Sequence, residues 1–150
     1  GFDPEGIANP LDPENVLTLQ LNPPEARYPE ARHARELARQ AVERLAAVPG
    51  IEGAAATSNI PWGNNGWTRS FQGEGQVFEP GYTPTADYRI VTPGYLALLK
   101  VPLLQGRHLA ESDGADAQKV AVISSAVANR YWPNESPVGK RLAFGSPPDP

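Results

Sequence analysis

The 150-residue sequence contains no cysteine, so disulfide bonds and thiolate metal sites are both excluded. It also lacks a long apolar run: the longest such stretches are a few residues, far short of the roughly 18 to 20 that span a bilayer. The N-terminus has no basic-then-apolar signal pattern. We therefore expect this stretch of chain itself to be soluble.

Positive charge is also scarce. The sequence has 13 basic residues against 17 acidic ones, with a net charge of -4. A protein that binds the phosphate backbone carries a basic face, so no nucleic-acid partner is expected. Only two histidines occur, His33 and His108, and nothing in the sequence places them together. We interpret both as solvated side chains rather than as metal ligands or general bases.

Proline and glycine are plentiful, at 17 and 14 residues, which predicts many turns and loops. The length fits one domain, residues 1–150, with a real core. A second lobe within it is placed around residues 61–115. The sequence opens on "GFDPEG" and closes on "SPPDP", neither of which resembles the natural edge of a folded unit. We expect a piece cut from a longer membrane protein.

The first sixty residues predict a strand, a helix and a strand. In residues 15–21, Leu17, Leu19 and Leu21 alternate with other residues, as in a half-buried strand. Residues 28–50 carry apolar side chains at helical spacing, and Pro49 and Gly50 end that pattern. Residues 51–58 are small and apolar, which favours a buried strand.

The segment 91–107 predicts a short helix and a corner. Thr92 is a suitable N-cap and Pro93 suits the first helical position, while Pro102 prevents continuation. An apolar side of about two turns would follow, and Gly106 is free to adopt a positive φ at the turn. The apolar residues of that side are Tyr95, Leu96, Leu98 and Leu99.

The C-terminal third predicts two further strands and a helix. Residues 119–124 form a strong buried-strand run, Ser124 or Ser125 caps the next helix, and Pro133 stops it. A final strand includes Leu142 and Phe144. The predicted fold class is α/β (α+β): a mixed sheet with short helices packed on it.

Five aromatic residues lie in a loop-like region. "WTRSF" alternates and could pair with residues 85–92, in which case the aromatic rings cover an antiparallel sheet. The alternative is a surface that contacts a partner or ligand, since exposed aromatic patches mark contacts. The candidate contact residues are Trp62, Trp67, Phe71, Phe78 and Tyr82.

No set of residues for catalysis emerges. Gly139 and Lys140 suggest a phosphate loop, but Asn134 stands where a glycine is required and Arg141 where Ser or Thr is required. The GxSxG pattern of a hydrolase is missing. An acidic cluster within 111–116 lacks the ligand spacing of a calcium loop. We expect no enzyme activity, no catalytic, cofactor or metal residues, and no cofactor.

An ordered set of motifs runs through the second half of the chain, with a matching strand and helix upstream, so that about residues 15–145 are covered. The motif residues are Pro93, Gly94, Tyr95, Pro102, Leu103, Leu104, Gly106, Arg107, Trp132, Pro133, Gly139 and Lys140. This series is similar to the MacB-like periplasmic core domain of ABC transporter permeases, the FtsX-like group with duplicated orphan members. His108 and the pair Ser124 and Ser125 depart from the family pattern.

The resemblance implies a domain on the periplasmic face of the cytoplasmic membrane. It implies a permease dimer whose transmembrane part connects to a cytoplasmic ATPase subunit or domain. Such domains transmit ATP-driven motion to the outside and contact a periplasmic partner protein or cargo. The alternative reading is a periplasmic ligand-binding module that uses the aromatic-rich segment 62–82.

Overall fold

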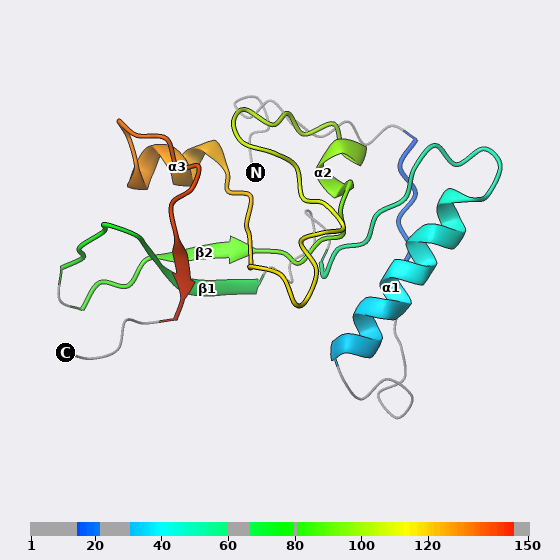
Figure 1. The fold of residues 1–150 in the computed structure, drawn as a ribbon, viewed down its shortest axis with the longest axis horizontal. Helices are drawn as coiled ribbons and strands as arrows, with labels where there is room; N and C mark the ends of the chain where they lie inside the picture. The colour runs from blue at the N-terminus through cyan, green and yellow to red at the C-terminus, as the bar shows by residue number, and fades with distance from the viewer. Residues whose placement is uncertain (1–14, 22–30, 60–66, 80, 146–150) are drawn as a thin grey trace, which may run out of the picture. The chain divides into compact units, whose positions relative to one another are not determined.

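The computed structural model describes residues 15–21, 31–59, 67–79 and 81–145. In this part of the chain the first element is a helix (Figure 1). The fold is mixed α+β, with a small sheet and few helices, mostly short. In chain order the elements are α1 (Ala31–Ala46), β1 (Trp67–Gly73), β2 (Thr85–Tyr88), α2 (Tyr95–Leu98), α3 (Ser125–Tyr131) and β3 (Leu142–Phe144).

The three strands form one antiparallel sheet in the order β2-β1-β3. Trp67 pairs with Tyr88, and Phe71 pairs with Phe144. The predicted hairpin between "WTRSF" and the segment from Thr85 is therefore confirmed, as is the final strand. The prediction of a mixed sheet was wrong, because every pairing between these strands is antiparallel.

The two faces of this sheet differ in chemistry. Side chains alternate along a strand, so Trp67 and Phe71 share one face with their cross-strand partners Tyr88 and Phe144. The opposite face is polar, and there the Thr68 hydroxyl donates a 2.7 Å hydrogen bond to Asp87. One face is thus aromatic and the other is open to water.

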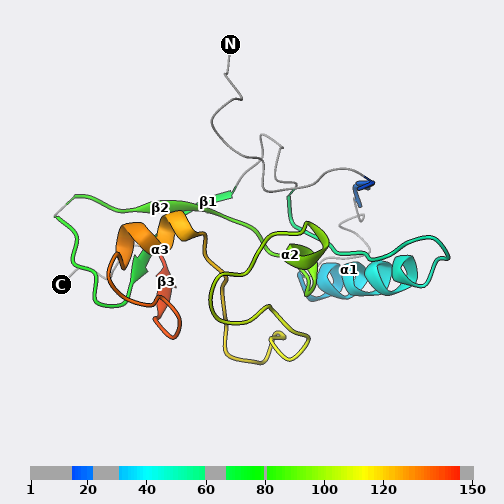
Figure 2. The ribbon, with the colours of Figure 1, turned by 90° about the horizontal axis from the view of Figure 1, so that it is seen from above.

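Helix α3 covers one end of the aromatic face (Figure 2). The ring of Tyr131 meets Phe71 edge-on at 5.0 Å between centroids, and Trp132 lies over Gly73. Both Phe71 and Trp132 are buried. Ser124 caps α3 by accepting a hydrogen bond from the Val127 N–H, so the first of the two predicted caps is the one used.

Helix α1 confirms the predicted long helix, although the residues just before Ala31 lie outside the described part. On its exposed side, Arg39 forms ion pairs with Glu36, at 2.7 Å, and with Glu43. The chain leaves the helix through Gly50, whose φ is 89°. The exposed pairs contribute little to stability, since such helix pairs are worth about 0.3–0.5 kcal/mol.

Helix α2 is a single turn, shorter than predicted, and its N-cap is Gly94 with φ 84°. Thr92 was the wrong N-cap, because its hydroxyl accepts a 2.8 Å hydrogen bond from the backbone N–H of Ala56 instead. Leu99, directly after the helix, is the buried member of this apolar group. Leu98 packs against Gly53.

Three predicted strands do not form. Residues 15–21 and 119–124 have no strand pairing. The predicted strand 51–58 is reduced to an isolated bridge at its end, where the Ser58 N–H donates to the Ile90 carbonyl at 2.8 Å and the Thr92 N–H donates to the Ala56 carbonyl at 2.9 Å. The leucines expected to be half-buried are exposed, with 84%, 67% and 55% of Leu17, Leu19 and Leu21 accessible. A strand needs a neighbouring strand along its length for its backbone hydrogen bonds, and none of these segments has one among the described residues. The predicted strand-helix-strand unit was therefore wrong.

The described chain falls into two compact units. One comprises the residues up to 56 together with 91–104, and the other comprises 57–90 together with 105–150. The sheet and α3 belong to the second unit, and α1 and α2 belong to the first. The prediction of one domain with a second lobe around 61–115 stays a prediction.

Candidate functional site

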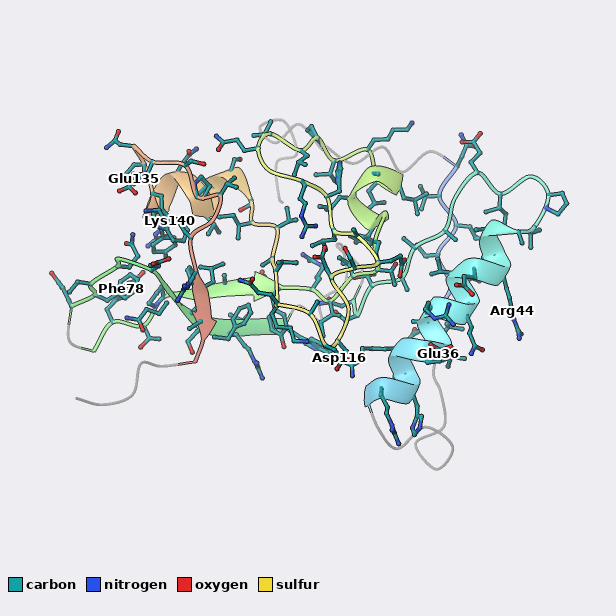
Figure 3. All side chains as sticks on the ribbon, viewed as in Figure 1. Glu36, Arg44, Phe78, Asp116, Glu135 and Lys140 are labelled. Atoms are coloured by element: carbon teal, nitrogen blue, oxygen red, sulfur yellow. The ribbon has the colours of Figure 1, made fainter. Side chains whose placement is uncertain are left out.

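An open groove of about 500 Å³ lies in the second unit, between the segment after β1 and the last turn of α3. Phe78, labelled in Figure 3, is on the loop side of this groove. We call it the β1–α3 groove. Its lining residues are Gln76, Val77, Phe78, Glu79, Tyr82, Arg130 and Tyr131.

The loop that forms one wall is attached to α3 by hydrogen bonds. The Gln76 side-chain amide donates to the Tyr131 carbonyl at 2.5 Å, and the Trp132 indole N–H donates to the Glu74 carbonyl at 3.4 Å. Gly75 turns the chain with φ 79°, a conformation that suits glycine. These contacts hold the loop and the helix end side by side.

Aromatic rings form the apolar part of the groove. Phe78 meets Tyr131 edge-on at 6.2 Å and contacts Tyr82 at 6.1 Å. Edge-to-face pairs at this distance are favourable. Burial raises the pKa of the Tyr131 hydroxyl above its ordinary value.

Arg130 supplies the positive charge of the groove. One of its guanidinium nitrogens donates to the Tyr82 hydroxyl at 3.1 Å, and the guanidinium carbon lies 5.7 Å from the centre of the Tyr131 ring. Within the described residues Arg130 has no carboxylate partner. Glu79 contributes an acid to the same lining.

The predicted aromatic contact residues separate into three places. Phe78 and Tyr82 line the groove, and Phe71 is buried beneath α3. Trp67 lies on the uncovered end of the aromatic sheet face, 5.7 Å from the ring of Tyr88. Trp62 lies outside the described residues. Whether any of them contacts a partner stays a prediction.

Arg130 and Tyr131 line the groove but were not predicted as site residues. Both were assigned only to a helix, and 48 positions separate Arg130 from its hydrogen-bond partner Tyr82. The available signal was an arginine and a tyrosine in the last turn of a short helix, next to a tryptophan. That signal gains meaning only when the fold brings the aromatic loop beside it.

The comparison with known protein families decides what kind of domain carries this groove. A family model described as the MacB-like periplasmic core domain matches residues 2–148. The chain belongs to the MacB-like periplasmic core domain family. A search of curated proteins and a search of solved structures each found no match.

MacB-like periplasmic core domains are non-catalytic domains of ABC transporter permeases, which act together with an ATPase. The domain is therefore periplasmic. No helix in the described part of the chain is long and apolar enough to cross a membrane. The predicted family, location and lack of enzyme activity are thus confirmed by the family match.

The motif residues of the MacB-like domain lie in turns and irregular segments, except Tyr95, which begins α2. Arg107 pairs with Asp113 through two 2.7 Å hydrogen bonds, and Lys140 pairs with Glu135 at 2.6 Å (Figure 3). Gly106 has the predicted positive φ, 80°. Of the remaining motif residues, Trp132 is buried and Leu104 is exposed. Their structural role stays a prediction.

Residues suited to metal binding or catalysis are not brought together. Among the described residues, no group of three or more His, Asp or Glu side chains could hold a metal ion. His33 lies on α1 and His108 in the loop after Gly106. What the site offers is binding chemistry: rings, one arginine and one acid around an open groove.

Proposed function

We propose that this domain transmits ATP-driven motion of an ABC permease to the periplasmic side, where it contacts partner proteins or cargo. The observation that supports the proposal is the family match over residues 2–148. A non-catalytic domain outside the membrane can contribute to an ATP-driven cycle only by moving and by binding. The permease acts as a dimer, so two copies of the domain move together.

These 150 residues contain no cysteine, so single labels can be placed in the domain within a full-length permease from which any other cysteines have been removed. Single cysteines replace the exposed residues Ala46, in α1, and Asn129, in α3, and carry spin labels. Pulsed electron spin resonance measures the distance between labels on the two copies, with no nucleotide and with ATP trapped. We expect the distance to differ between the two states at both positions.

The control is a permease whose ATPase cannot bind nucleotide, which should keep the nucleotide-free distances. Labels that report the same distances in both nucleotide states at both positions would contradict transmission. ATP consumption measured on the same samples shows that the labelled permease is active.

The groove favours a second candidate function, that of a periplasmic ligand-binding module. Its rings from the segment 62–82 would form a platform for a hydrophobic or glycan ligand. Trp132 follows the groove residue Tyr131, with their rings 6.4 Å apart, so its fluorescence reports on the groove. Titration with lipid vesicles and with oligosaccharides tests this candidate, and unchanged fluorescence throughout removes it.

A further inference from the structure

We propose that the β1–α3 groove is a docking site for an extended segment of a partner protein that carries one acid among neutral residues. A carboxylate of that segment binds Arg130, and a neighbouring apolar side chain contacts Phe78 and Tyr131. The inference rests on the proposed function, because it names the chemistry of the partner that the domain contacts.

Arg130 is held ready for such a carboxylate. A guanidinium group has five N–H donors in a rigid plane. The Tyr82 hydroxyl accepts a hydrogen bond from one of the Arg130 nitrogens at 3.1 Å. The Tyr131 ring, 5.7 Å away, limits how the plane can turn. The remaining N–H groups contact no carboxylate among the described residues. They can therefore donate two parallel hydrogen bonds to an incoming carboxylate, the bidentate geometry that arginine favours.

The aromatic rings beside Arg130 favour a partner segment with an apolar side chain next to its acid. Phe78 and Tyr131 form an edge-on pair at 6.2 Å, and Tyr82 is 49% exposed at the rim. Tyrosine and arginine are the residues that most often dominate protein–protein binding energy. An apolar side chain next to the acid would cover the rings and exclude water from the ion pair, which strengthens it.

The open shape of the groove favours a polypeptide over a small molecule. Sites for small ligands bury roughly 70–90% of the ligand surface, whereas one side of this groove is solvent and Val77 beside it is 95% exposed. A chain that crosses the groove and continues along the surface needs no such enclosure. Val77, at the open side of the lining, then provides apolar contact area for that chain.

Glu79 restricts how a partner can lie. It belongs to the same lining as Arg130, and the whole chain carries a net charge of -4. A partner with a run of acids would meet repulsion from Glu79, so the fitting segment has one acid flanked by neutral residues. Repulsion of this kind is a common source of specificity.

The test uses the 150-residue chain and a pair of seven-residue fluorescent peptides. Both have the form Gly-Ser-X-Phe-Ser-Gly-Ser, where X is Asp in one and Asn in the other. Fluorescence anisotropy measures binding. We expect the Asp peptide to bind about two- to fivefold more tightly than the Asn peptide, since Arg130 is exposed and an ion pair at an exposed site contributes less than one tenfold step in affinity.

Two variants locate the charge contact. Arg130→Gln should abolish the preference for Asp, whereas Arg89→Gln, which removes an exposed arginine outside the groove lining, should keep it. Circular dichroism melts show that both variants are folded. Tyr82→Phe keeps the ring but removes the hydroxyl that holds Arg130, and it should weaken the preference partly.

Equal binding of the two peptides, or no binding of either, overturns the inference. So does a preference that survives Arg130→Gln. Binding of N-acetylphenylalanine as tight as that of the Asp peptide would show a small-carboxylate site instead. These results leave the spin-label experiment untouched, so the docking site can fail while transmission stands, and the reverse also holds.

Discussion

Gly73 lies at a position where no larger side chain fits. It lies against the indole ring of Trp132, and an added Cβ would be 2.7 Å from the Trp132 Cζ2 atom. Both residues belong to the packing of α3 on the aromatic sheet face. The close approach therefore fixes how far the helix end stands from β1.

Gly73→Ala should destabilise the protein, because Trp132 must move to admit the methyl group. Overpacking of this kind costs about 1–3 kcal/mol, measured as the free energy of unfolding in denaturant. Gly114→Ala is the control, since an added Cβ there has its nearest neighbour at 3.7 Å. A Gly73→Ala variant as stable as the unchanged protein would mean that Trp132 is loosely packed.

The pair Arg107 and Asp113 predicts an acid-sensitive loop. Hydrogen bonds from the Arg107 guanidinium and from the Ala110 N–H lower the pKa of Asp113 from 3.8 to about 2. A pKa lower in the folded state means that the contribution to stability is complete above the ordinary pKa. It is lost as the pH falls from that value through about 2.

Carboxyl-carbon NMR measures this directly. The Asp113 signal should titrate well below pH 3.8, and Arg107→Gln should raise its midpoint toward that value, with the Ala110 N–H hydrogen bond still present. A midpoint for Asp113 equal to the usual aspartate value would show that the ion pair is not populated in solution.

At the scale of elements, α3 depends on its cap. The helix has only seven residues, too few to be stable by itself in water, so it depends on its packing against β1 and on the 3.3 Å bond from the Val127 N–H to Ser124. Ser124→Ala should cost about 0.5–2 kcal/mol, measured by thermal unfolding. Ser125→Ala, at the first helical residue, should cost almost nothing; the opposite ranking would move the cap to Ser125.

Elements that depend on nearby residues could be predicted from the sequence, whereas among those that need a distant partner only the strand β3, which pairs with β1, was predicted. Helices α1 and α3 follow from spacing and stop signals that lie within each segment. The hairpin of β1 and β2 also has partners close in sequence. The segments 15–21, 51–58 and 119–124 have strand-like composition, but alternation states only which face is apolar and says nothing about the presence of a neighbour.

The cap of α2 shows the same limit on a smaller scale. Thr92 has the right chemistry for an N-cap, yet its hydroxyl contacts the backbone of Ala56, 36 residues earlier. Gly94 takes the cap position in a left-handed conformation. A competing long-range hydrogen bond is not visible in the local sequence.

At the scale of the whole molecule, charge sets which partners are excluded. With 17 acidic and 13 basic residues, the chain should not shift a DNA duplex in a gel mobility assay at low salt, where phosphate contacts are strongest. A shift that disappears as salt is raised would contradict this prediction. A mildly acidic periplasmic domain is suited to protein contacts that depend on a few placed charges, such as Arg130.

Only one of the two sides of the candidate groove could be predicted from the sequence. Its loop side follows from the unusual number of aromatic residues between 59 and 84, which pointed to either sheet cover or a contact surface. Both occur: Phe71 is under α3, whereas Phe78 and Tyr82 line the groove. The helix side, with Arg130 and Tyr131, depends on tertiary packing between segments about fifty residues apart, which no local pattern encodes.

The outward leucines of residues 17–21 have a practical consequence for laboratory work. Exposed apolar side chains that lie close together in the chain favour association between copies. The isolated domain should therefore form oligomers as its concentration rises. Replacing Leu17 and Leu19 by threonine, which keeps the extended preference, should give a better-behaved sample for crystallisation.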